Sequence, residues 1–308
     1  MSEGPGPRAE RPVIGAERPG ADDAAAPCPA CGAALLAGEG ALLRCRSCGS
    51  AVTAAPPVPA ARDAGRMRPR GSRLAAPLLG LFDRQRLALL PPPPARLLDA
   101  GAGRGRFVAA ARRAGYEASG LEPSERGVRA AADAYGVVLQ RTGIEEARVE
   151  EQDAVTLWHV LEHLEDPGAA LARIASWLRP GGTLVVGVPN VASLQARLFG
   201  ERWFHLDLAR HRVHFSPAGL EALLRRHGFV PVHERHVLLE HNPLGLWLSA
   251  LPGAYPFRFL RGEAPFDVRL VALSIAALPL LPVAALVELA AGLARRGGTI
   301  AVVATRAR

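Results

Sequence analysis

Beyond about residue 74, short apolar segments of strand length alternate with longer amphipathic segments. This pattern predicts strands at 96–100, 117–121, 154–158, 183–188, 229–237 and 299–304, and helices at 105–114, 124–135, 167–178 and 217–227. A Pro-Gly-Gly sequence at 179–182 predicts a turn. Strands that alternate with helices of this length are typical of a mainly parallel sheet with helices on both faces. We therefore predict a doubly wound α/β domain over residues 74–308.

Three other regions precede this domain. Residues 1–26 are poor in large apolar side chains and have no continuous apolar segment, so they are expected to be disordered and not to form a secretory signal peptide. Residues 27–50 hold all four cysteines, and residues 51–73 form a linker rich in Pro, Ala and Arg. Without an export signal we expect a cytoplasmic chain with reduced thiols.

Composition adds little about partners. The net charge is +8 and all 37 basic residues are arginine, a bias that suggests the base composition of the coding sequence. No run of arginines is interleaved with aromatic residues, so we expect no nucleic-acid partner. The hydrophobic fraction of 49% is ample for a large core.

A glycine-rich loop follows the first predicted strand. Gly101, Gly103 and Gly105 would let the backbone approach a ligand closely, since glycine has no Cβ and tolerates positive φ. The dinucleotide fingerprint requires glycine at 106, where this chain has Arg106, so a nicotinamide enzyme is disfavoured. Glu122 ends the next strand, where a carboxylate can accept both ribose hydroxyl protons of a nucleoside.

The motif Asp-x-Gly-x-Gly-x-Gly at 99–105 resembles motif I of class I S-adenosylmethionine-dependent methyltransferases. Residues 153–164 and 178–184 resemble later segments of that family, and 205–216 resembles a segment of ubiquinone-biosynthesis O-methyltransferases. The resemblance covers about residues 74–240 and the last strand. It implies a Rossmann-like methyltransferase sheet with S-adenosylmethionine as cofactor and a small or lipid-linked acceptor, methylated on oxygen. The rival interpretation is a zinc-ribbon binding protein that holds the cofactor without turnover.

The resemblance also implies roles for single residues. The acid of the motif would contribute to the methionine end of the cofactor, the loop would supply backbone contacts, and the segment after the second strand would hold the ribose. Either Ile144 or Glu145 would contact adenine. The residues expected to bind cofactor are Asp99, Gly101, Ala102, Gly103, Gly105, Glu122, Pro123 and His159.

Histidines supply the candidate chemistry. Some ubiquinone O-methyltransferases carry Glu-x-x-Glu-His for a divalent ion where this chain has His159, Glu162 and His163. One interpretation is that these residues bind a second metal ion. We favour the other, in which His159 lines the pocket and Glu162 and His163 make local hydrogen bonds. Three histidines at 205–214 form either a substrate-side lid with a general base or a structural turn. His163 and His211 are the candidate bases, although an acidic acceptor would scarcely need one.

Two Cys-x-x-Cys-Gly knuckles, 13 residues apart, form the N-terminal module. Each knuckle brings two thiolates to one ion, so Cys28, Cys31, Cys45 and Cys48 are expected to bind a structural Zn²⁺ as a small zinc ribbon. Disulfides and redox chemistry are the weaker alternatives.

Residues 243–293 form an apolar helical insertion before the last strand, with 18 uncharged residues at 270–287. Pro279 and Pro282 are expected to divide this stretch into two short arms, and both flanking strands belong to one sheet. We therefore predict a helical hairpin lying on an anionic membrane surface, on the inner face, with 246–248 as an added anchor. An apolar cap buried on the domain or in a dimer is the alternative. The flanking arginines are Arg258, Arg261, Arg295 and Arg296.

Overall fold

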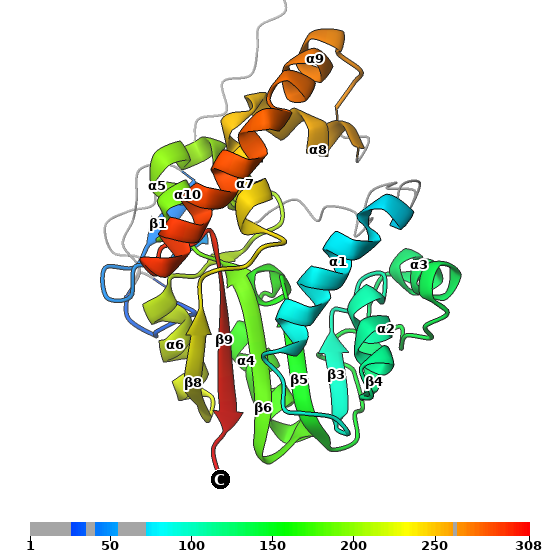
Figure 1. Cartoon of the computed structure of the whole chain (residues 1–308). Coiled ribbons are helices and arrows are strands. Elements are labelled where there is room, and N and C mark those ends of the chain that lie inside the picture. The colour runs from blue at the N-terminus through cyan, green and yellow to red at the C-terminus, as the bar shows by residue number, and fades with distance from the viewer. Residues whose placement is uncertain (1–25, 35–40, 55–71, 261–263) are drawn as a thin grey trace, which may run out of the picture.

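The computed structural model describes residues 26–34, 41–54, 72–260 and 264–308 (Figure 1). Most of the start predicted to be disordered, and residues 55–71 of the predicted linker, lie outside the described residues. The strands are β1 (Leu42–Arg44), β2 (Ala51–Thr53), β3 (Arg96–Ala100), β4 (Glu117–Leu121), β5 (Gln152–Trp158), β6 (Leu178–Pro189), β7 (Val213–His214), β8 (Phe229–Arg235) and β9 (Thr299–Arg306). The α-helices are α1 (Ser72–Leu87), α2 (Arg106–Arg113), α3 (Glu125–Tyr135), α4 (Pro167–Trp177), α5 (Leu194–Phe199), α6 (Pro217–Arg226), α7 (Asn242–Ala250), α8 (Tyr255–Leu260), α9 (Val268–Ala276) and α10 (Leu281–Leu293).

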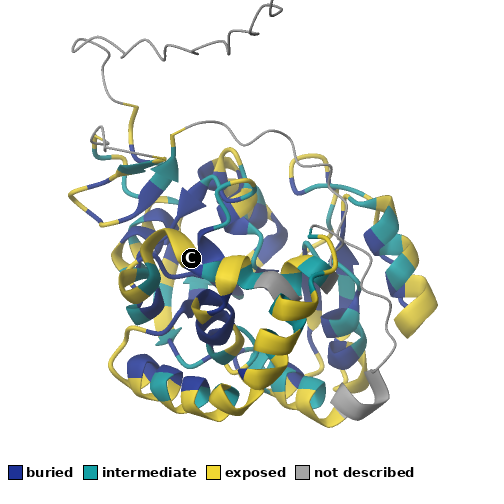
Figure 2. Cartoon of the chain, turned by 90° about the horizontal axis from the view of Figure 1, so that it is seen from above, coloured by how far each residue is buried: buried dark blue, intermediate teal, exposed yellow. Residues whose placement is uncertain are grey.

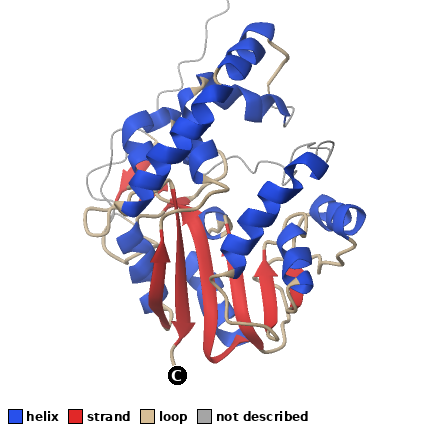
Figure 3. Cartoon of the chain, viewed as in Figure 1, coloured by secondary structure: helices blue, strands red, loops and turns tan. Residues whose placement is uncertain are grey.

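Six strands form the central sheet, in the order β4-β3-β5-β6-β9-β8 (Figure 3). The strands β4, β3, β5 and β6 are parallel, whereas β9 runs antiparallel to both β6 and β8. Within this sheet the chain enters at β3, continues to β4 at the edge, and then crosses to the other side of β3 to form β5 and β6, as in a doubly wound sheet. The predicted fold class is confirmed.

Helices cover both faces of this sheet, and each strand contributes to both sides. Leu98 and Leu184 pack with Leu171 of α4 on one face, while Leu97 and Val185 pack with Phe107 of α2 on the other. Because alternate side chains are buried on opposite faces, β3, β9 and the second half of β6 are mainly apolar, which is why they were recognisable in the sequence.

Short polar side chains begin the helices that flank the site. The hydroxyl of Ser124 accepts a hydrogen bond from the amide of Gly127 at the start of α3. Asp166 caps α4, and Ser216 caps α6 in the same way. Each cap satisfies a backbone N–H that has no partner within the helix, so the helix starts are fixed locally.

The turn predicted at 179–182 is instead a bulge within β6. Gln152 pairs with Leu178 and Ala154 with Thr183, so one residue of β5 lies opposite four residues of β6. Gly181 has a φ of +75°, a conformation that glycine adopts without strain. The bulge lets β6 begin at the end of α4 and resume pairing with β5 at Thr183.

The cysteine module is joined to the large domain by a second sheet of order β1-β2-β7. β2 pairs with β1 and also, through Ala51 and Val52, with His214 and Val213 of β7. The first residues of the predicted linker are therefore a strand, because their backbone pairs with a segment 160 residues away in the sequence.

The apolar insertion comprises α7 to α10 and lies beyond the carboxyl ends of the parallel strands (Figure 1). The predicted division of this stretch is confirmed, since α9 ends at Ala276 and α10 begins at Leu281 with a 3-10 turn at 278–280 between them. The predicted hairpin is wrong, because the two segments follow one another as one helical run, Val268–Leu293, long and apolar enough to cross a membrane. Pro282 lies in the first turn of α10, where proline is tolerated. The predicted anchor at 246–248 is also wrong, since Leu246, Trp247 and Leu248 are buried in α7.

Candidate functional site

The glycine loop links the end of β3 to the start of α2. Gly101, Gly103 and Gly105 have φ values of +83°, +56° and +71°, which side chains rarely adopt. A Cβ on Gly101 would overlap the side chain of Val160, whereas a Cβ on Gly103 would enter open space. The loop therefore packs tightly against the segment after β5 and leaves bare backbone at Gly103.

Glu122 is held at the end of β4 beside this loop. Its carboxylate accepts hydrogen bonds from the amides of Gly103, at 2.9 Å, and Ser124, at 2.8 Å. Gly127 allows the close approach of α3, because a Cβ there would lie 2.7 Å from Glu122 Cγ. Each carboxylate oxygen has two lone pairs, so the fixed carboxylate can still accept hydroxyl protons.

Asp99 lies beneath the loop, buried in β3. The hydroxyl of Thr156 donates a 2.7 Å hydrogen bond to its Oδ1 atom. Burial raises the pKa of Asp99 to about 6, although the bond from Thr156 opposes this shift. The structure thus brings Asp99, the glycine loop and Glu122, all predicted to bind cofactor, together at the carboxyl ends of β3 and β4.

Three histidines and one glutamate lie together beyond the end of β5: His159, Glu162, His205 and His241. His159 has a φ of +55°, a strained conformation for a non-glycine residue and one that recurs at functional sites. Its ring centroid lies 4.1 Å from that of His241 and 5.9 Å from that of His205. Its Nδ1 atom is 3.2 Å from Glu162 Oε1. Nε2 of His159, Nε2 of His205 and both carboxylate oxygens of Glu162 are buried without a hydrogen-bond partner.

Burial sets the protonation of this cluster. It lowers the pKa of His159 to about 4, with help from the charge of Arg86. It lowers the pKa of His205 to about 3, with help from His159. It raises the pKa of Glu162 to about 7. The imidazoles of His159 and His205 are therefore neutral at neutral pH and hold a proton only weakly, so they suit hydrogen bonding to a ligand better than proton transfer.

The two predicted bases, His163 and His211, lie next to each other. Their ring centroids are 4.7 Å apart, with His163 exposed and His211 buried. His163 Nδ1 is 3.1 Å from the carbonyl oxygen of Arg210, and His211 Nδ1 is 2.9 Å from that of His205. Burial, and then the charge of His163, lowers the pKa of His211. Potential metal-ligating atoms of Glu162, His163 and His211 lie within 4.8 Å of one another, a set that includes His211 in place of His159.

Sequence reasoning missed three residues at this site. Arg86, from α1, lies over the ring of Trp158 at 4.7 Å and pairs with Glu240 at 2.7 Å. Glu240 also pairs with Arg106 at 2.6 Å, and His241 is 3.0 Å from Arg86. The sequence does contain a signal for two of these residues, since Glu240 and His241 form a polar pair just before the apolar insertion.

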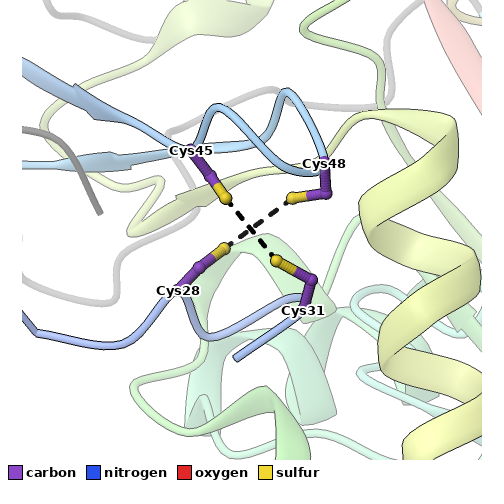
Figure 4. A group of neighbouring side chains, drawn as sticks. All are labelled: Cys28, Cys31, Cys45 and Cys48. Carbon is purple, nitrogen blue, oxygen red and sulfur yellow. Dashed lines mark hydrogen bonds between the residues drawn. The ribbon is translucent and has the colours of Figure 1, made fainter. Parts of the chain in front are cut away.

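The four cysteines face a common centre (Figure 4). Cys28 Sγ lies 3.8 Å from Cys48 Sγ, and Cys31 Sγ lies 3.5 Å from Cys45 Sγ, with all four atoms within 4.8 Å of one another. These separations exceed a disulfide bond of about 2.05 Å. Four sulfurs around a tetrahedral ion with Zn–S bonds of about 2.3 Å would lie about 3.8 Å apart, so the cluster fits zinc.

The cysteine module also contacts the candidate base. The hydroxyl of Thr53 donates a 2.6 Å hydrogen bond to the carbonyl oxygen of His211 and lies 3.1 Å from His214 Nε2. Ser216 donates to the carbonyl oxygen of Cys48. The segment that carries His211 is thus fixed at its far end by the cysteine module.

Comparison with known proteins identifies the family. The model of a methyltransferase domain matches residues 75–234, which are 160 of the 308 residues. The chain belongs to this methyltransferase domain family. The prediction of membership in the class I S-adenosylmethionine-dependent methyltransferases is therefore confirmed.

Curated relatives of this methyltransferase include two named ubiquinone biosynthesis O-methyltransferase. The protein from Rhodopseudomonas palustris (strain HaA2) is 30% identical over 161 residues, 48% of this chain and 63% of the relative. The protein from Cereibacter sphaeroides (strain ATCC 17025) is 30% identical over 176 residues, 53% of this chain and 70% of the relative. The match thus spans slightly less than two thirds of the first relative's length.

Solved structures similar to the methyltransferase support the fold. The [4+2]-cyclase SpnF has a TM-score of 0.50 at 19% identity, covering 80% of this chain and 85% of SpnF. Another similar structure is a chain from the complex of the Haloferax volcanii Trm112 methyltransferase activator with a methyltransferase. Its TM-score is 0.50 at 19% identity, and the match covers 78% of this chain and 94% of that chain. At such identities the likeness shows the fold alone, and a cyclase among the neighbours illustrates that the fold does not fix the reaction.

Proposed function

We propose that this enzyme transfers the methyl group of S-adenosylmethionine to a hydroxyl oxygen of a small or lipid-linked acceptor. The observation that carries the proposal is the packing of Gly101 against Val160, which sets the glycine loop directly beside the histidine cluster. The names of the relatives favour oxygen as the atom methylated.

The chain's own residues suit the cofactor. The sulfonium group supplies an electrophilic methyl, and transfer is an in-line displacement that depends on holding the nucleophile on axis. The bare backbone of Gly101, Ala102, Gly103 and Gly105 would contact the methionine end, with Asp99 beneath it. Glu122 and Pro123 would hold the ribose, and His159 would line the pocket. Glu145, which is exposed, would face adenine, since Ile144 is buried in the core.

The histidine cluster would orient the acceptor and take its proton. The unpartnered nitrogens of His159 and His205 and the oxygens of Glu162 are polar atoms that a hydroxyl ligand would satisfy. His163, which is exposed and whose ring lies 4.7 Å from that of buried His211, would receive the hydroxyl proton, and His211 would support it.

We also propose that Cys28, Cys31, Cys45 and Cys48 bind one structural Zn²⁺. Four thiolates leave no open coordination position, so the ion would support the fold and take no part in chemistry. Through β2 and β7 it would stabilise the segment that carries His211.

The test is release of S-adenosylhomocysteine with catechol, phenol and carboxylate acceptors, with and without prenyl tails. We expect turnover on a hydroxyl acceptor. On a hydroxyl acceptor that is not ionised at the assay pH, His163→Asn is expected to lower kcat by about 10²-fold or more without weakening cofactor binding, and exposed His233→Asn serves as the control. Exclusive methylation of a nitrogen or carbon acceptor, or a His163→Asn enzyme with full kcat, would contradict the proposal.

A further inference from the structure

The helical run α9–α10 carries a broad apolar face that nothing in the described protein covers. Ile275 is 61% exposed and Leu286 is 67% exposed, values typical of surface polar residues. Figure 2 looks down on this end of the molecule and shows exposed residues along its outer helices. The large aliphatic side chains exposed along the run are Val268, Leu273, Ile275, Leu278, Leu280, Val283, Leu286, Leu289 and Leu293. Contiguous apolar patches of this kind mark interaction sites.

The other side of α10 is packed and fixed. Ala284 and Ala291 are buried, and Ala284 packs in one cluster with Leu246 and Leu248 of α7. Trp247 donates a 2.8 Å hydrogen bond to the carbonyl oxygen of Ala277, the residue that joins α9 to the next turn. The exposed side chains are therefore held in place on a rigid support.

The exposed apolar face of α9–α10 carries no charged side chain between positions 270 and 293. Glu288 is the only charged residue between positions 270 and 293, and it points inward, where it is buried and accepts a hydrogen bond from the amide of Gly298. Positive charge stands at both ends of the run, with Arg269 exposed at one end and Arg296 exposed at the other. Apolar residues flanked by arginine suit an anionic lipid surface.

The residue types distinguish lipid from a second protein chain. Cores of protein interfaces are enriched in Tyr, Trp, Phe and Arg. The sequence from 268 to 293 contains no aromatic residue, and its exposed apolar side chains are all aliphatic. Such a surface matches hydrocarbon better than it matches a protein partner.

The topology distinguishes a helix that lies on the membrane from one that crosses it. The insertion leaves the central sheet after β8 and returns to it at β9, and these two strands pair with each other. A single helical run cannot cross a bilayer and return within that connection. We propose that α9–α10 lies in the interface of an anionic bilayer with the face defined above inserted among the lipids.

This membrane face is linked to the candidate site through α7. A Cβ on Gly245 of α7 would lie 2.6 Å from His205 Nε2, so α7 packs directly on the histidine cluster as well as on α10. Resting on the proposed function, this arrangement favours a lipid-linked acceptor, presented beside the cluster. Binding to the bilayer itself does not depend on the reaction.

Flotation of the full chain with vesicles tests the proposal. We expect binding to vesicles of equal parts phosphatidylcholine and phosphatidylglycerol, weaker binding to phosphatidylcholine alone, and a loss with rising salt. The double variant Ile275→Glu, Leu286→Glu should bind at least tenfold more weakly. The matched control is Val138→Glu, Val232→Glu, since those side chains are 81% and 59% exposed elsewhere. Arg296→Gln should weaken binding to the anionic vesicles about fivefold.

Cofactor binding by each variant serves as the check of folding, and turnover on a soluble acceptor is measured separately. Membrane binding without any turnover would support this inference and contradict the proposed function. Turnover without vesicle binding would support the proposed function and contradict this inference. A concentration-dependent dimer in ultracentrifugation, abolished by the Ile275→Glu, Leu286→Glu pair and accompanied by no flotation, would assign the face to a second copy of the chain and overturn the inference.

Discussion

The hydroxyl of Thr53 donates a 2.6 Å hydrogen bond to the backbone carbonyl oxygen of His211, a residue 158 positions later in the sequence. This bond joins the strand that follows the second cysteine knuckle to the segment that carries a candidate base. The cysteine module is thus attached, through β2, to the segment that carries His211. A weakened module should therefore change catalysis as well as stability.

Thr53→Val tests this link by removing the hydroxyl while keeping a β-branched side chain. We expect a loss of about 1 kcal/mol of unfolding free energy, faster hydrogen exchange at residues 211–214, and a lower kcat with an unchanged zinc content. Thermal unfolding, exchange measurements and metal analysis report these quantities. Thr53→Ser keeps the donor and should restore kcat; equal effects of both substitutions would show that the hydrogen bond is unimportant.

The central fold was predictable because its signals are local. Leu97 and Leu98 are buried on opposite faces of the sheet, so β3 reads as a continuous apolar segment before the glycine loop. Ser124 caps α3 with its own side chain. The carboxyl ends of β3 and β4 meet by topology, which was enough to predict that Gly103 and Glu122 lie close together.

The rest depends on contacts between distant segments. The pairing of β2 with β7 has no signal in either short strand, so residues 51–53 were interpreted as linker. His241 joins His159 only because the chain returns to the cluster after β8. Pro279 and Pro282 correctly marked the junction between α9 and α10, where each lies in the first turn of its segment and costs no hydrogen bond. They did not reveal that the two segments form one helical run.

Gly103→Ala should weaken cofactor binding. The added methyl would enter the open space beside Glu122 and strain a backbone with a φ of +56°. We expect the Kd for S-adenosylmethionine, measured by calorimetry, to rise at least tenfold. Gly136→Ala is the matched control, since Gly136 has a φ of +63°, open space around it, and a position at the end of α3. Both variants should lose about 1 kcal/mol of stability, but Gly136→Ala should bind the cofactor normally.

Metal analysis should find one zinc per chain. The tetrahedral sulfur cluster accounts for that ion, and Cys31→Ser should release it and lower the melting temperature. Cobalt substitution should give the spectrum of a tetrahedral thiolate site. A second equivalent of metal that is retained by Cys31→Ser but lost in Glu162→Gln would show that the Glu162, His163 and His211 group is a metal site, contrary to our interpretation.

Stability should rise with pH between about 4.5 and 6.5. Burial lowers the pKa of His159 to about 4, of His205 to about 3 and of His214 to about 4, so below pH 6.5 the unfolded chain binds protons that the folded chain excludes. Burial raises the pKa of Asp99 to about 6 and of Glu162 to about 7, so these acids act in the opposite direction. The histidines outnumber the acids, and burial also lowers the pKa values of His211 and His241.

Two substitutions separate these opposing contributions through denaturant unfolding at several pH values. His205→Asn removes a group that takes up a proton only on unfolding, so the slope of unfolding free energy against pH should fall by up to about 1.4 kcal/mol per pH unit. Glu162→Gln removes a group that stays protonated only in the folded chain, so the slope should increase. Slopes that move in the same direction for His205→Asn and Glu162→Gln would mean that the cluster is not dry in the folded enzyme, because desolvation shifts an imidazole and a carboxyl toward their neutral forms together, whereas a nearby charge favours the neutral form of only one of them.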